Sequence, residues 1–141
     1  MANSISRVAS ILLALTGLLF AMACSSRSGT ERPLTADAKA YVRNLKLSDV
    51  SMKATESYAK QTLIEIEGKM ENAGDRSVSS AAVYCVFYDS YGQVVIRERV
   101  PIVKTPLKPG ESRSFRLPFD DIPPSWNNQM PQLVIAAIDF S

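Results

Sequence analysis

The sequence predicts an all-β fold, an antiparallel β-sandwich of about seven strands, behind an N-terminal segment that is removed during export. Two observations predict the sandwich. Short runs that are apolar at every second position, or apolar throughout, recur from about residue 40 onward. Clusters of glycine, proline, asparagine and aspartate, which are typical of turns, separate these runs. A third observation, an uncharged apolar run close to Met1, marks the exported leader.

The leader has the composition of a secretory signal peptide. Arg7 supplies a positive charge, residues 8–20 (VASILLALTGLLF) form an apolar run without charge, and Ala21 and Ala23 place small residues after it. This order of segments is typical of a cleaved signal. The run is shorter than the ~20 apolar residues that a membrane-spanning helix usually needs. An uncleaved, single-pass N-terminal helix is the alternative.

Cys24 stands directly after the small residues and resembles the cysteine that bacterial lipoproteins acylate. Lipoprotein signals usually end in Leu-Ala-Gly-Cys or Leu-Ala-Ala-Cys, and Ala21 and Met22 depart from these at the two more tolerant positions. The resemblance implies cleavage between Ala23 and Cys24 and a diacylglyceryl chain on the Cys24 thiol. A serine rather than an aspartate follows, which implies the outer membrane of a bacterial cell envelope, on its periplasmic side. Cleavage without acylation is the second possibility.

The remainder of the 141-residue chain is predicted to be one domain on a tether. Residues 1–23 form the signal peptide, residues 24–40 the lipidated cysteine and a flexible tether, and residues 41–141 the β-sandwich. The whole chain carries 16 Lys and Arg against 14 Asp and Glu. So small a net charge gives no electrostatic reason to expect a nucleic acid partner.

Six stretches have strand patterns, and one has the pattern of a short helix. The strand stretches are residues 45–52, 61–71, 78–89, 93–103, 112–119 and 133–140, and residues 35–43 could form one or two helical turns. Alternation places Ile64, Ile66, Gly68 and Met70 on one face of their strand and points Phe115, Leu117 and Phe119 to the core. The stretch 78–89 is apolar on both faces, which is typical of a strand in the middle of a sheet. The last stretch is apolar on both faces as far as Asp139.

The segments between the strands contain recognisable turns. Residues 72–76 include Gly74, which is free to take a positive φ, and Pro109 and Gly110 suit the two middle positions of a type II turn. Strands this short, at this spacing in about 100 residues, favour an immunoglobulin-like or fibronectin-type-III-like sandwich.

The stretch IEGKMENAGDRSVSSAAVYCVFYDSYGQVV resembles the FxLYD domain and the water-stress type of late-embryogenesis-abundant domain. Tyr88 and Asp89 match the FxLYD pattern, while Cys85 and Phe87 stand where that pattern has Phe and Leu. The downstream stretch PLKPGESRSFRLPFDDIPPSWNNQMPQL resembles a bacterial domain of unknown function that has a Trp-Asn-x-Gln-x-Pro loop. Together the resemblances cover about residues 41–140. They imply an immunoglobulin-like architecture and transfer no catalytic residue.

Catalytic chemistry is not expected. The chain has no histidine, which excludes Ser-His-Asp and Cys-His catalysis and histidine-ligated metals. Ser57 and Lys60 have the Ser-x-x-Lys spacing of some serine enzymes, but the partner motifs are missing, so a polar turn is favoured. Glu65 and Glu67 lie on one face of a strand beside a lysine, and a solvated surface is favoured over a pair of catalytic carboxylates.

Three aspartates and one cysteine could carry chemistry but have simpler roles. Asp89, Asp120 and Asp121 could offer oxygen ligands to calcium, yet no loop has the alternating acidic spacing of a calcium site, so capping of turns is favoured. Cys85 lies in a strand pattern, where a free thiol behaves as a small buried apolar side chain.

Trp126, Arg97 and Arg99 are the candidate partner-binding residues. Trp126 could anchor a partner, or it could plug one end of the sandwich with its indole N–H bonded to a carbonyl, and the plug is favoured. Arg97 and Arg99, with Arg113 and Arg116 on a neighbouring strand, could form a basic surface for anionic lipid or polysaccharide. Interleaved glutamates favour solubilising edge charges instead.

These observations predict a non-catalytic module that a lipid holds in the cell envelope, where it binds or scaffolds another envelope protein. No cofactor, metal, nucleic acid or small-molecule substrate is expected. The alternatives are an accessory subunit of an envelope enzyme or transport complex, and a single-pass protein that keeps its N-terminal helix.

Overall fold

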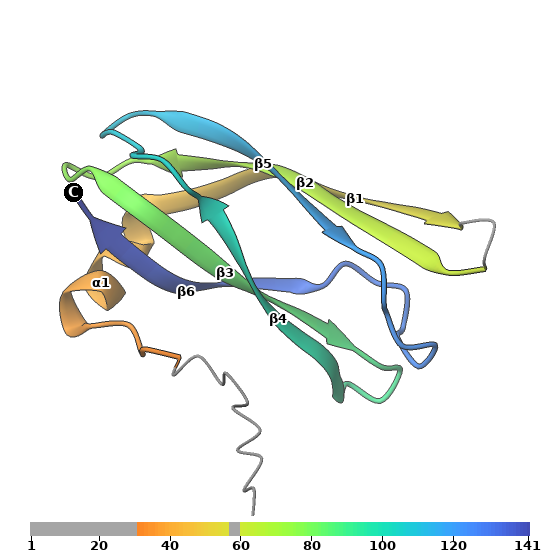
Figure 1. Ribbon diagram of the computed structural model, residues 1–141. Coiled ribbons are helices and arrows are strands. Elements are labelled where there is room, and N and C mark those ends of the chain that lie inside the picture. Colours follow the sequence, from red (N-terminus) through yellow and green to blue (C-terminus); the bar gives the residue numbers. More distant parts are fainter. Residues whose placement is uncertain (1–30, 57–59) are drawn as a thin grey trace, which may run out of the picture. The chain divides into compact units, whose positions relative to one another are not determined.

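The computed structural model describes residues 31–56 and 60–141, which form two antiparallel sheets of three strands each (Figure 1). Sheet A has the strand order β1-β2-β5, and sheet B has the order β4-β3-β6. The elements are α1 (Ala36–Tyr41), a 3₁₀ turn (Val42–Asn44), β1 (Leu45–Glu56), β2 (Thr62–Asn72), β3 (Val78–Tyr88), β4 (Val94–Val103), β5 (Ser112–Phe119) and β6 (Gln132–Phe140). The sheets share one apolar core, so the fold is the all-β sandwich that the sequence predicts.

Each of the six predicted stretches forms a strand, and the described residues contain six strands rather than about seven. β1 runs to Glu56 instead of ending near Met52, because its whole length pairs with β2. A bulge interrupts this ladder after Ser48, and Asp49 there takes the left-handed conformation with φ 52°. The predicted cleavage and acylation positions, Ala23 and Cys24, lie outside the described residues. No helix within residues 31–56 and 60–141 is long and apolar enough to cross a membrane.

The period-2 patterns correctly predict the core-facing side chains. Every predicted inward residue with a side chain in β2 and β5 is buried: Ile64, Ile66, Met70, Phe115, Leu117 and Phe119. β3 lies between β4 and β6, as its two apolar faces predict, and its Val83, Cys85 and Phe87 are fully buried. A run of buried aliphatic and aromatic side chains therefore fills the space between the sheets.

The N-terminal part of the described chain is more ordered than a tether. Thr35 caps α1, since its Oγ1 accepts a hydrogen bond from the Ala38 amide at 3.2 Å. Ala38 and Tyr41 on the inner side of α1 are buried in the core, and the Tyr41 ring meets Phe140 of β6 edge to face at 5.1 Å. Packing of the domain therefore extends upstream of residue 41.

The turns agree with the sequence except at Gly74. Gly110 has φ 76°, and the Glu111 amide donates to the Lys108 carbonyl at 3.0 Å, as a type II turn requires. Gly74 does not take a positive φ. A Cβ at this position would collide with the Tyr41 hydroxyl, so the glycine is needed for close approach rather than for backbone freedom.

A buried polar centre, which the sequence patterns do not indicate, closes the α1 end of the sandwich. Asn72 is fully buried, and its Nδ2 donates to the carbonyls of Arg76 at 2.7 Å and Leu107 at 3.0 Å. Its Oδ1 accepts from the Tyr41 hydroxyl at 2.8 Å and the Gly74 amide at 3.2 Å. All four hydrogen-bonding positions of this amide are used, which is how a buried amide side chain avoids a desolvation penalty.

Candidate functional site

The described residues hold no cluster of three or more His, Cys, Asp or Glu that could bind a metal ion. Of the two residues with the Ser-x-x-Lys spacing, Ser57 lies outside the described residues, and Lys60 lies within them. Asp89 caps the β3–β4 hairpin, because its Oδ1 accepts from the amides of Tyr91 at 2.9 Å and Gln93 at 2.8 Å. The aspartate is thus a turn residue, as predicted.

The four arginines that could have formed a basic surface are divided between the two sheets. Arg97 and Arg99 belong to β4 in sheet B, whereas Arg113 and Arg116 belong to β5 in sheet A. Three of them are paired with carboxylates: Arg97 with Glu31 at 3.4 Å, Arg113 with Glu111 at 3.0 Å and Arg116 with Glu67 at 2.7 Å. Carboxylates therefore interleave with these arginines, and the favoured interpretation from the sequence, solubilising charges, stays in place of a continuous basic surface.

Arg97 belongs to a small cluster on the outer face of sheet B. Its guanidinium lies 3.6 Å from the centre of the Tyr84 ring and pairs with Glu31, the first described residue. The hydrogen bond from Tyr84 and the charge of Arg97 lower the pKa of the Glu31 carboxyl, and the same hydrogen bond raises the pKa of the Tyr84 hydroxyl. The cluster thus holds the start of the described chain on this face. Sequence patterns did not indicate Glu31 or Tyr84, since their contact spans 53 positions of the chain.

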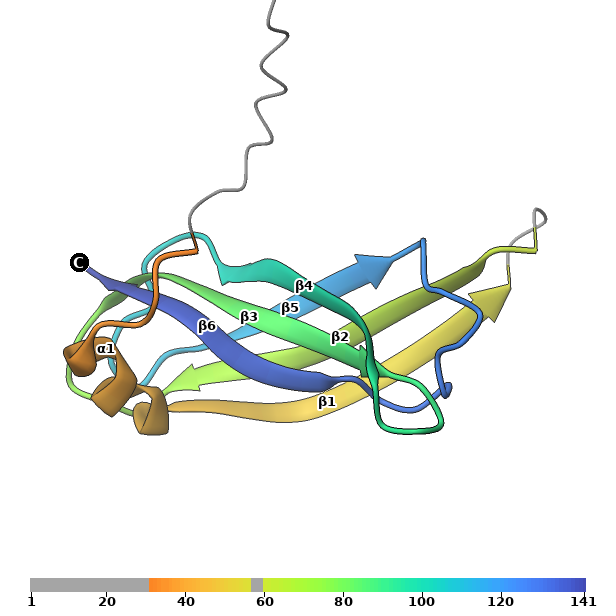
Figure 2. The same ribbon diagram turned by 90° about the horizontal axis from the view of Figure 1, so that it is seen from below.

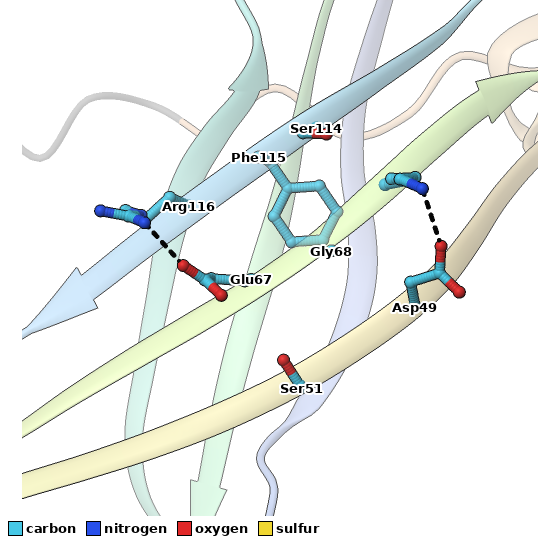
Figure 3. A pocket seen from close by; sticks show the side chains of 8 residues that line it. Asp49, Ser51, Glu67, Gly68, Ser114, Phe115 and Arg116 are labelled. Atoms are coloured by element: carbon cyan, nitrogen blue, oxygen red, sulfur yellow. Dashed lines mark hydrogen bonds and ion pairs between the residues drawn. The ribbon is translucent and has the colours of Figure 1, made fainter.

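A shallow hollow of about 400 Å³ lies on the opposite outer face, that of sheet A (Figure 3). Ser51 and Ser114 provide little side-chain volume there, so the hollow forms above the sheet. Two ion pairs border it, Arg116 with Glu67 and Lys69 with Asp49 at 3.0 Å (Figure 3). Each pair joins one positive and one negative side chain, so the two pairs add no net charge to the hollow.

Glu67 is the most heavily paired carboxylate of this face. Lys53 lies at 3.0 Å from one of its oxygens and Arg116 at 2.7 Å from the other. Hydrogen bonds from Lys53 and then Arg116 lower the pKa of the Glu67 carboxyl. Arg116 also approaches Glu65 at 3.7 Å. A carboxylate held ionised in this way is a poor general acid, which agrees with the predicted solvated surface.

Trp126 is a plug rather than an exposed anchor. Only 6% of its surface is exposed, its ring packs against Phe87 at 5.8 Å, and its indole N–H donates to the Gln129 carbonyl at 3.2 Å. The loop is fastened to β3 by the Asn127 amide, which donates to the Tyr88 carbonyl at 2.9 Å. The candidate role of Trp126 in partner binding is therefore withdrawn, because its indole already serves the core.

Cys85 is a buried thiol without a cysteine partner among the described residues. Burial, and secondarily the charge of Glu98, raises the pKa of its thiol to about 12. The thiolate is the reactive form of cysteine, so a thiol in this setting is inert.

We expect Cys85 to resist labelling in the folded protein. In a Cys24→Ser variant, where Cys85 is the only thiol, Ellman's reagent should release no chromophore from the native protein at pH 8 and one equivalent after unfolding in urea. The raised pKa also means that the folded state favours the neutral thiol. The resulting stabilisation is present below the ordinary pKa near 9 and is lost as the pH rises from 9 toward 12. Rapid labelling of the native protein would contradict the buried position.

Comparisons with known proteins give structural likeness without a family. No family model matches the chain, and no curated protein matches it. One similar solved structure is a Bordetella pertussis protein provisionally assigned as ApaA, with 17% identity and a TM-score of 0.43 over 68% of this chain and 90% of that one. Another is an X-ray structure of a structural genomics target, with 10% identity and a TM-score of 0.45 over 70% of this chain and 86% of that one.

Proposed function

We propose that this chain is a lipid-anchored, non-catalytic protein of the bacterial cell envelope that binds or scaffolds another envelope protein. The observation that carries the proposal is the leader, in which an uncharged apolar run and small residues directly precede Cys24. Within the described domain, the paired carboxylate Glu67 and the buried thiol Cys85 fit structural roles, which is compatible with a binding module.

We further propose that the sandwich is of immunoglobulin-like type. The sheet orders β1-β2-β5 and β4-β3-β6 support this, because they correspond to strands A-B-E and C′-C-F of that fold. In that fold a seventh strand, G, lies beside strand F. The matching place here is the free side of β6.

The anchor would hold the domain close to the bilayer. Seven residue steps separate Cys24 from Glu31, and a fully extended chain of that length spans at most about 25 Å. Contact of Glu31 with Arg97 fixes where the tether meets the domain. We place the protein on the periplasmic side of the outer membrane, from the serine that follows Cys24.

Replacing the anchor cysteine tests the proposal. In the full-length protein expressed in a Gram-negative host, we expect Cys24→Ser to move essentially all of the protein from the membrane fraction to the soluble periplasmic fraction and to abolish incorporation of a palmitate analogue. Cys85→Ala is the matched control, because it removes the other cysteine and should stay with the membranes. If the Cys24→Ser protein stays membrane-bound with its leader uncleaved, the N-terminal helix is the anchor and the lipoprotein proposal fails.

A further inference from the structure

β6 is an edge strand whose second side faces no other strand of the described domain. In an antiparallel ladder, alternate residues turn their N–H and C=O groups away from the paired neighbour. About half of the backbone polar groups of β6 therefore point away from β3. Such a row is a template for one more strand.

The other three edge strands carry charged side chains or prolines that protect them against further pairing, and β6 does not. Protection in natural sheets comes from charged side chains, prolines and bulges. β1 has a bulge at Asp49 together with Lys46, Lys53 and Glu56; β4 has Arg97, Glu98, Arg99 and Pro101; β5 has Arg113, Arg116 and Pro118. β6 has no charge and no proline from Gln132 to Ile138, and the one irregularity of that stretch is a bulge at Ala136 in the ladder with β3.

The composition of β6 is that of a strand with two neighbours. Like central β3, it is apolar on both faces, a pattern typical of strands that are covered on both sides. Its core-facing Leu133 and Ile135 are only half-buried, and its outward-facing Val134 is 42% exposed. Half-buried Leu47 and Met52 lie on β1, at the same side of the sandwich (Figure 2). Apolar surface is thus left incompletely covered along the β1–β6 side.

We infer that β6 accepts an extended, uncharged segment of a partner protein as a further strand of sheet B, in an interaction that rests on the envelope-binding function proposed above. Backbone hydrogen bonds would supply affinity, and alternate side chains of the donated segment would cover Leu133 and Ile135 on one face and Val134 on the other. The seven-residue run without charge on β6 offers no partner for a charged side chain, so the fitting segment is apolar or neutral at those positions.

The chain's own tether does not fit this place. Residues 24–30 (CSSRSGT) are polar and include an arginine. They join the domain at Glu31, which pairs with Arg97 on β4, and β4 is separated from the free side of β6 by β3. The polar residues 24–30 are therefore a poor match for an apolar strand beside β6.

A second copy fits less well than a free segment. The Phe140 end of β6 is occupied by α1 through Tyr41, which leaves Gln132–Ala136 for pairing. The inward side chains of the second copy's β6 would also already be packed in its own core, so they could not cover the exposed apolar surface.

Site-specific photo-crosslinking of the full, anchored protein in cells tests the inference. A photoreactive phenylalanine analogue replaces Val134 on β6. The matched control is the same replacement of Val94, a valine on the opposite edge of the same sheet that is more exposed, at 54%. We expect one protein adduct from position 134 and none from position 94. Mass spectrometry should place the attachment in a partner segment with at least five consecutive uncharged, mostly apolar residues.

A synthetic peptide with that partner sequence then serves as the probe for the purified domain. We expect Val134→Lys, which adds the charge that protects other edges, to weaken peptide binding at least tenfold, and Val94→Lys to change it less than twofold. Bound peptide should slow amide hydrogen exchange in Gln132–Ala136. Circular dichroism of both variants verifies that they remain folded.

Several results would overturn the inference. An adduct of twice the chain's own mass identifies a second copy as the occupant, an internal adduct identifies residues 24–30, and a lipid adduct identifies the membrane. Equal adducts from positions 134 and 94 would show no preference for β6, and no adduct from position 134 would show that no segment binds there. The Cys24→Ser fractionation is independent of these outcomes. If the wild-type protein is anchored but gives no adduct at position 134, strand addition is rejected and anchoring is not. If the wild-type protein is soluble, uncleaved or unacylated but its β6 still binds the peptide, anchoring is rejected and strand addition is not.

Discussion

Phe87→Ala is expected to lower the free energy of unfolding by about 4 kcal/mol. Phe87 is fully buried in central strand β3. Its ring meets Phe119 edge to face at 5.1 Å and Trp126 at 5.8 Å, so it joins β3, β5 and the 120–131 loop. Alanine would leave a cavity among three elements that are each held by further contacts and cannot all collapse into it.

Urea unfolding followed by Trp126 fluorescence measures this change, with the purified domain carrying Phe87→Ala. Phe87→Leu is the control, since it keeps most of the apolar volume and should cost less than about 1.5 kcal/mol. Equal losses for the two variants would show that cavity volume is not the origin of the effect.

Asn72→Ala is expected to lower the free energy of unfolding by about 3 kcal/mol. The change removes both donors from the carbonyls of Arg76 and Leu107 and leaves the Gly74 amide without its acceptor. The single proton of the Tyr41 hydroxyl, which loses Asn72 as its acceptor, can turn to the Arg76 carbonyl at 3.0 Å, and the Leu107 carbonyl keeps the Val78 amide. The cost therefore falls below that of leaving both carbonyls fully unpaired in the core.

Chemical denaturation of Asn72→Ala measures this loss. Asn127→Ala is the matched control, because Asn127 lies in a more exposed loop and its Nδ2 makes a longer hydrogen bond, 3.3 Å to the Asp89 carbonyl. We expect a loss below about 1 kcal/mol for the control. A neutral Asn72→Ala would contradict the buried amide network.

These two positions lie at opposite ends of the sandwich. Phe87 and Trp126 close the end at the β3–β4 hairpin, whereas Asn72 and Tyr41 close the end at α1. The β4 side of sheet B carries charged residues and a proline. The long side along β6 has neither a packed aromatic or amide cluster nor a row of charges and prolines, which is why a partner strand is proposed there.

The sequence by itself determined the strands and their inward faces. Alternation over residues 61–71 and 112–119 was sufficient to assign the buried side chains, because a strand's own backbone directs successive residues to opposite faces. The type II turn at Pro109-Gly110 was likewise predicted from two adjacent residues. Such features depend on neighbours a few positions away, so they can be predicted from one chain.

Tertiary structure alone decided which strands are neighbours and which side chains meet. A basic surface of four arginines was the alternative to solubilising charges, and only the sheet topology shows that β4 and β5 divide these arginines between two sheets. Gly74 accommodates Tyr41 from 33 positions upstream, and Asn72 forms a buried centre with the same residue. The apolar pattern of β6 predicts cover on both faces, yet only pairing between distant strands decides that one side stays free. Each of these outcomes depends on long-range contacts, which a pattern within one strand does not encode.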